Sequence, residues 1–147
     1  MSILEPIISL DIFNSIQITK PALFRQTLEL ALCHPAMELS YQKFLGQLQE
    51  SGNTSTVKGY LETLEHAFIL KQLRKYNPNK ISSKVSSPKI IPLCPALISA
   101  FNKPKKIIDD HSWKGFVFEA YIGAELIKRF DSVYSVSYTH LTLPTKA

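Results

Sequence analysis

The sequence predicts an α+β fold that is mainly α-helical and carries one β-hairpin. Three observations lead to this prediction. Apolar residues recur at helical spacing in three successive segments between residues 21 and 68. Two short apolar runs follow, one on each side of a polar loop. Apolar residues make up 45% of the 147 residues, which is enough for a core and too much for a disordered chain.

Three helices are expected in the first 50 residues, before the central helix of the chain. A short helix is expected over residues 8–14. The next should begin at Pro21, a residue that suits the first helical position, and end at Cys33, before Pro35. A third should follow Ser40, which is a good cap, and stop near Glu50. Gly52 is then expected either as the left-handed residue at the C-terminal end of this helix or in a turn.

The central helix is expected over residues 55–67, with Asn53 or Thr54 as its cap. Four apolar residues at the spacing i, i+4, i+7 and i+11 define its inward face. These residues are Val57, Leu61, Leu64 and Phe68. The outward face carries Thr56, Lys58, Glu62 and His66, among other polar residues.

A β-hairpin is expected after the central helix. The run that begins at Phe68 alternates between apolar and polar residues, which is typical of a strand. Residues 77–87 are polar and predict a loop, and residues 87–94 predict an edge strand with a proline at each end. Three helices followed by such a hairpin predict a winged helix–turn–helix with the hairpin as its wing.

Two more helices are expected after the hairpin. The first is short and covers residues 95–103, and a charged linker follows. The second covers residues 113–130 and should direct Phe116, Ala120, Ile127 and either Ile122 or Gly123 inward. A strand is expected to begin near residue 131.

The positive charge of the chain is concentrated in the hairpin. The formal net charge is +5, but residues 1–70 carry −3 and residues 90–147 carry +2. Residues 71–89 hold six bases and no acid. These bases are Lys71, Arg74, Lys75, Lys80, Lys84 and Lys89. Such a segment is either an electrostatic contact for phosphate or a solvated hairpin.

No pattern in the sequence predicts a catalytic, metal or cofactor site. The five glycines form no phosphate-binding loop. The two cysteines, Cys33 and Cys94, and the four histidines do not stand at metal-ligand spacing. No apolar run approaches the length of a membrane span, and no signal peptide is indicated. We therefore expect a non-enzymatic cytoplasmic protein without membrane contact.

The candidate nucleic-acid-binding residues lie on the central helix and the hairpin. Ser, Thr and Lys side chains can contact phosphate, whereas Glu62 and Glu65 would repel it. The helix offers no arginine for guanine, so sequence-specific readout is not expected. We expect weak, non-specific DNA binding, mainly through the hairpin. The candidates are Thr56, Lys58, Lys71, Arg74, Lys75, Lys80, Lys84 and Lys89.

Three motifs carry a resemblance to a known family. They are "LSYQKFLGQLQESGNTSTVKGYLETLE" at residues 39–65, "SSPK" at residues 86–89, and the G-x-x-x-E pattern at Gly115–Glu119. The sequence resembles the C-terminal region of prokaryotic AAA-type ATPases from about residue 7 to residue 134. In that family, a domain of unknown function follows the ATPase domain and is similar to a winged helix joined to a nuclease-like fold of the PD-(D/E)XK type.

The resemblance implies a division of the chain and a larger parent protein. It implies the end of a preceding region at 1–20 and a winged helix at 21–102. It further implies a linker and the opening helix of a truncated nuclease-like α/β fold at 103–135. ATP and Mg²⁺ would belong to a missing N-terminal ATPase domain, so this fragment should hold no cofactor. Glu119 matches an acid of the nuclease-like fold whose metal-binding partners would lie beyond this chain.

The tail and the partners of the chain leave alternatives open. Residues 136–147 resemble the translation of a sequencing adapter, and the alternative is a genuine threonine-rich strand. The winged helix could bind DNA, or it could be a protein-interaction or self-assembly module without a nucleic-acid role. Expected partners are therefore DNA, the missing ATPase domain, another protein or a second copy of the chain.

Overall fold

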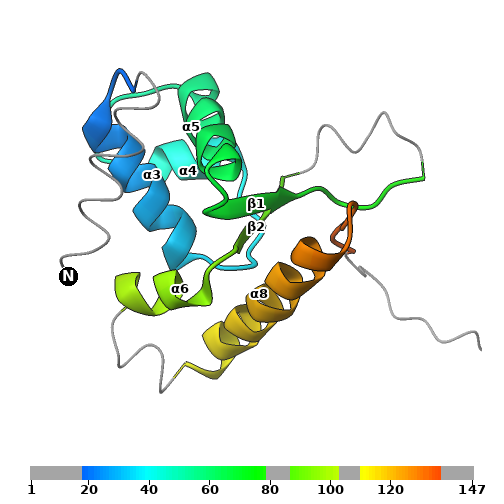
Figure 1. The fold of residues 1–147 in the computed structure, drawn as a ribbon. Helices are drawn as coiled ribbons and strands as arrows, with labels where there is room; N and C mark the ends of the chain where they lie inside the picture. The colour runs from blue at the N-terminus through cyan, green and yellow to red at the C-terminus, as the bar shows by residue number, and fades with distance from the viewer. Residues whose placement is uncertain (1–17, 79–86, 103–109, 137–147) are drawn as a thin grey trace, which may run out of the picture.

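The structure, a computed structural model, describes residues 18–78, 87–102 and 110–136. It is an α+β fold, mainly helical, with one antiparallel hairpin, as predicted (Figure 1). The helix expected at 8–14, most of the wing loop, the charged linker and nearly all of the tail lie outside these residues. The elements in chain order are α3 (Pro21–Cys33), α4 (Tyr41–Gln47), α5 (Thr54–His66), β1 (Leu70–Leu73), β2 (Lys89–Pro92), α6 (Pro95–Phe101) and α8 (His111–Arg129).

The helix starts follow the expected capping chemistry. Pro21 occupies the first turn of α3, and Ser40 caps α4 by accepting a hydrogen bond from the Lys43 amide at 3.2 Å. Asn53 caps α5 because its Oδ1 accepts from both the amide (2.8 Å) and the hydroxyl (2.9 Å) of Thr56. The bounds of α3 are those predicted from its prolines.

The first core joins the three helices to the hairpin. Phe24 of α3 packs edge-on against Tyr60 of α5, with ring centroids 5.3 Å apart. Leu61 and Leu64, both predicted to face inward, are fully buried. The remaining buried members of this cluster are Leu23, Leu28, Ala31, Leu32, Leu39, Phe44, Val57, Leu70 and Ile90.

The hairpin has the strand arrangement of a winged helix. Leu70 of β1 faces Pro92 of β2, and Leu73 faces Lys89. The segment between α3 and α4 lies along the opposite edge of β2, because the Ala36 amide donates to the Ile90 carbonyl at 2.7 Å. A bridge between Glu38 and Lys89 continues this pairing. The arrangement of helices, wing and bridging segment is therefore winged-helix-like.

A second core holds α8 against the outer side of the hairpin (Figure 1). Trp113, Ala120 and Ala124 of α8 are buried with Ile91 of β2 and Ile98 of α6. Gly123 allows close approach, since a Cβ there would lie 3.2 Å from Ile91 Cδ1. Of the residues predicted to face inward, Ala120 and Gly123 are buried, Phe116 and Ile127 are half-buried, and Ile122 is exposed.

The prediction that Phe68 belongs to the inward face of the central helix was wrong. Phe68 is 81% exposed and has a φ of 56°, in the left-handed region. The amide of Phe68 donates to the Glu65 carbonyl and that of Ile69 to the Leu64 carbonyl, at 3.1 and 3.0 Å. These two bonds form a Schellman motif that ends α5 before Phe68, so the side chain leaves the helical face. Glycine is the usual residue at this position.

Two smaller expectations about the second helix of the winged unit also failed. It ends at Gln47 rather than near Glu50, and no glycine among the described residues has a positive φ. Because α4 ends at Gln47, five positions before Gly52, Gly52 is not the residue that terminates this helix. Gly52 instead permits close packing, since a Cβ there would lie 2.7 Å from Leu23 Cδ2. Within the described ranges, no helix is both long and apolar enough to cross a membrane.

Candidate nucleic-acid interface

A groove of about 700 Å³ runs between the outward face of α5 and the strand β1. Tyr41 from α4 and Pro88 also line it. Its polar lining combines bases and acids at close range. The lining residues are Tyr41, Lys58, Glu62, Glu65, His66, Phe68, Lys71, Gln72, Arg74 and Pro88.

The acids of α5 pair with two of the three bases in this groove. Lys71 of β1 forms an ion pair with Glu65, and Lys58 Nζ lies 3.9 Å from Glu62 Oε1. Both pairs are at the surface, where an ion pair contributes roughly 0–1 kcal/mol and can exchange with an incoming phosphate. Arg74 is exposed and forms no ion pair within the described part of the chain. It is therefore the base most available to a ligand.

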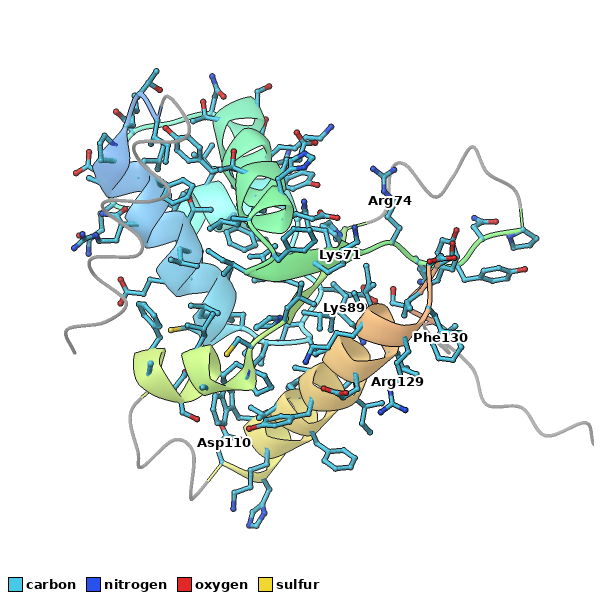
Figure 2. All side chains as sticks on the ribbon, viewed as in Figure 1. Lys71, Arg74, Lys89, Asp110, Arg129 and Phe130 are labelled. Atoms are coloured by element: carbon cyan, nitrogen blue, oxygen red, sulfur yellow. The ribbon has the colours of Figure 1, made fainter. Side chains whose placement is uncertain are left out.

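Figure 2 shows Arg74 projecting from the end of β1 into open space, away from α8. The residue that follows, Lys75, is half-buried and pairs through its backbone with Ser135. The Ser135 amide donates to the Arg74 carbonyl at 3.0 Å, and the Tyr76 amide donates to the Ser135 carbonyl at 2.8 Å. The segment after α8 thus holds the backbone from which Arg74 projects.

A short hydrogen-bond chain fixes the floor of the groove. The Tyr41 hydroxyl donates to Gln72 Oε1 at 3.1 Å, and Gln72 Nε2 donates to Glu65 Oε2 at 3.2 Å. Burial raises the pKa of the Tyr41 phenol, and Glu62 and Glu65 add to this, while Arg74 opposes it. Tyr41 is therefore a neutral donor at physiological pH.

Lys89 faces the opposite side of the hairpin from Arg74. Its Nζ lies 2.5 Å from Glu119 Oε1 of α8, and its side chain is only 14% exposed. Figure 2 shows Lys89 between the hairpin and α8. Lys89 therefore stabilises the packing of α8 and is not positioned to contact a ligand in the groove.

Of the other predicted residues, one has a structural role and two lie outside the described residues. Thr56 is half-buried, and its hydroxyl donates to Asn53 within the cap of α5. Lys80 and Lys84 lie outside the described residues. The groove thus brings together Lys58, Lys71 and Arg74, and it leaves Thr56 and Lys89 apart from them.

The described surface is close to electrically balanced. Eleven bases and nine acids fall within the described ranges, a net charge of +2, and the remaining +3 of the chain lies in the other segments. The concentration of positive charge that the sequence shows is therefore reduced by the acids that the fold brings beside it. A ligand with many phosphates would gain little from this surface.

A second groove of about 400 Å³ lies between β1 and the end of α8. Its apolar lining includes Leu73, Leu93, Ile127, Phe130 and Val133. Phe68 and Lys71 line both grooves.

Sequence reasoning missed the exposure of Phe68 because its spacing continues the apolar face of α5. The one available signal was the expected end of the helix at Ala67, because Phe68 then lies just outside the helix.

The described residues show neither a metal cluster nor a disulfide. No group of three or more His, Cys, Asp and Glu side chains gathers among them. Cys33 is half-buried and Cys94 is exposed, and neither takes part in a disulfide among the described residues. Glu119 has Lys89 as its partner. In the described residues, the groove beside Arg74 brings together Lys58, His66, Lys71 and Arg74, whose side chains can donate hydrogen bonds to a ligand.

Comparisons with known proteins give one match. No curated protein and no solved structure matches the chain. A family described as "Domain of unknown function (DUF8612)" matches residues 2–106, which is well over half of the 147 residues. The matched range includes α3, α4, α5, the hairpin and α6, and it ends before α8. The chain therefore belongs to the DUF8612 family.

Proposed function

We propose that this chain is a non-catalytic accessory domain of a larger ATP-binding protein and that it binds nucleic acid weakly through the groove between α5 and β1. The observation that carries the binding proposal is Arg74, which is exposed beside an open groove and forms no ion pair with any described residue. Lys75 adjoins it in the sequence, and Lys80 and Lys84 follow shortly after. The parent ATPase rests on the resemblance in three motifs alone, and ATP and Mg²⁺ would bind there. The proposal places the protein in the cytoplasm.

The winged-helix-like arrangement supports the proposal in a modified form. In DNA-binding winged helices, the third helix enters the major groove. Here the corresponding helix, α5, presents Glu62 and Glu65 beside its lysine, which disfavours deep entry between phosphates. Arg74 instead projects from the end of β1, where the hairpin continues (Figure 2). The wing is therefore the better contact, and binding should be non-specific.

The test is a titration of the 147-residue chain with fluorescein-labelled oligonucleotides, followed by anisotropy at about 50 and 150 mM salt. We expect weak binding that weakens further with salt. The R74A variant should bind less and should lower the salt slope by about 1. R129A is the matched control, because Arg129 is an exposed arginine at the end of α8 that lines neither groove. Absence of binding at low salt would refute the proposal.

A second candidate function is protein interaction, and a specific observation favours it. The outer face of α8 carries apolar side chains at helical spacing that nothing described covers. Phe118 is 67% exposed, Ile122 47% and Leu126 40%. Apolar stripes of this kind are typical of faces that pack against another chain or domain. The ATPase domain that the resemblance implies, or a second copy of this chain, could occupy it.

Sedimentation velocity tests this candidate in its self-association form. If α8 mediates self-association, the wild-type sedimentation coefficient should rise with concentration, and I122E should abolish the rise. A monomer at all concentrations would remove self-association and leave only a different protein as partner. Nucleic-acid binding should be unaffected by I122E, since Ile122 lies on α8 and no residue of α8 lines the groove between α5 and β1.

A further inference from the structure

Phe68 stands out in the described structure because its backbone and its side chain are both in unfavourable states. A positive φ is rare for a bulky residue, and the Schellman position that Phe68 occupies is usually glycine. The side chain gains almost no burial in return, since it is 81% exposed. Nothing in the packing of the domain therefore explains an aromatic residue here. An outlier of this kind points to a role in binding.

The surroundings of Phe68 match the chemistry of a nucleotide. The ring lines the groove that also holds Lys58, His66, Lys71 and Arg74. Single-stranded nucleic acids are bound by aromatic side chains on which bases stack, next to cations that contact the backbone. Arg74, directly after β1, lines the same groove and can supply the phosphate contact. Tyr41 and Gln72 add polar groups to the floor.

The charge balance favours a single strand over a duplex. A duplex hides the faces of its bases, so binding to it depends on neutralising many phosphates. The groove has only three bases, and two of them are paired with Glu62 and Glu65. Stacking on an exposed ring needs few phosphate contacts. A surface with little net charge and a projecting aromatic side chain therefore fits unpaired bases better than paired ones.

We propose that the ligand of this groove is single-stranded nucleic acid and that Phe68 is the platform on which one base stacks, with Arg74 on the adjoining phosphate. This inference rests on the proposed function and adds the class of nucleic acid and the residue that selects it. It predicts that affinity depends on the presence of an unpaired base. It also predicts that this dependence is lost with the ring of Phe68.

The experiment compares three labelled probes of equal length with the full chain: oligo-dT, the same strand with abasic sites, and a duplex. The abasic strand keeps the phosphates and removes the stacking surface. We expect oligo-dT to bind most tightly. F68A and F68L should weaken its binding by about 5- to 150-fold, to the level of the abasic strand. F68W should retain it, and Y121A is the matched control, since Tyr121 is an exposed aromatic residue of α8 that lines neither groove.

Each outcome separates this inference from the proposed function. R74A should weaken oligo-dT and the abasic strand alike, because it removes a phosphate contact. If oligo-dT and the abasic strand bind equally, or if F68L binds like the wild type, the stacking role of Phe68 is overturned while phosphate binding stands. If no probe binds at low salt, both proposals fail. F68G guards against misfolding, because glycine suits this backbone, and it should lose binding while remaining folded.

Discussion

Lys89 Nζ lies 2.5 Å from Glu119 Oε1, and this ion pair joins the winged-helix hairpin to α8. The two residues come from different motifs, "SSPK" and the G-x-x-x-E helix, which are separated by 25 residues or more in the sequence. The lysine side chain is 14% exposed and the carboxylate 49%. The pair links β2 to α8. These two elements also pack together in the second core around Trp113, so the pair supports that packing.

Removing Glu119 should destabilise the packing of α8 on the hairpin. E119A leaves the mostly buried Lys89 ammonium without its acceptor, which costs about 1–3 kcal/mol of unfolding free energy. E119Q keeps an acceptor and should lose less. Urea unfolding followed by the fluorescence of Trp113 measures this, because it is the single tryptophan and is 3% exposed. E125A, at an exposed pair within α8, should change little, and an equal loss in both variants would argue against the pair.

Replacing Phe68 with glycine should stabilise the fold. The left-handed conformation costs an L-residue about 1–2 kcal/mol, and glycine adopts it without that penalty. Part of this gain is offset by the greater entropy of glycine in the unfolded chain, so we expect about 1 kcal/mol. F68A keeps the strained backbone and should gain nothing. Thermal unfolding checks this, and a lower melting temperature for F68G than for F68A would contradict the assignment.

Two glycines of α8 should respond differently to alanine. A Cβ at Gly115 meets nothing within 4 Å, so G115A should add about 0.8–1.0 kcal/mol of helix propensity. A Cβ at Gly123 would lie 3.2 Å from Ile91 Cδ1, so α8 or the hairpin must shift. We expect G123A to gain less than G115A or to lose stability. Equal gains in urea unfolding would mean that α8 does not pack closely on β2.

Tyr41 should make the stability of the domain sensitive to alkaline pH. Because burial raises the pKa of Tyr41 in the folded state, the unfolded chain loses this proton first as the pH rises. The stabilisation from the neutral phenol is thus complete below the unfolded pKa of about 10 and is lost as the pH rises through the folded value. The stability difference between wild type and Y41F should shrink above about pH 10. A difference that is constant from pH 8 to pH 11 would contradict the shift.

Local sequence rules predicted the elements of this fold well. Pro21, Ser40 and Asn53 mark helix starts because proline and capping side chains act within one turn of the backbone. Apolar spacing correctly identified the buried face of α5 from Val57 to Leu64. The hairpin strands followed from the apolar runs on each side of the polar loop. These signals need no knowledge of distant contacts.

The site was harder to predict because charges from separate elements meet only in the folded chain. Residues 71–89 contain six bases and no acid. In the folded chain, however, Glu65 of α5 pairs with Lys71, and Glu119 of α8 pairs with Lys89. The exposure of Phe68 depends on where α5 ends, and helix ends are set by backbone geometry that periodicity does not report. Whether α8 opens a nuclease-like fold stays a prediction.

The most direct test of nucleic-acid binding through the α5–β1 groove is a map of backbone amide shifts on the ¹⁵N-labelled 147-residue chain as oligo-dT is added. We predict that the largest perturbations fall on the amides of His66, Phe68, Lys71, Arg74 and Lys75, and that R74A reduces them. The outer face of α8, around Phe118 and Ile122, should stay unperturbed. Shifts confined to α8, or no shifts at low salt, would contradict the account.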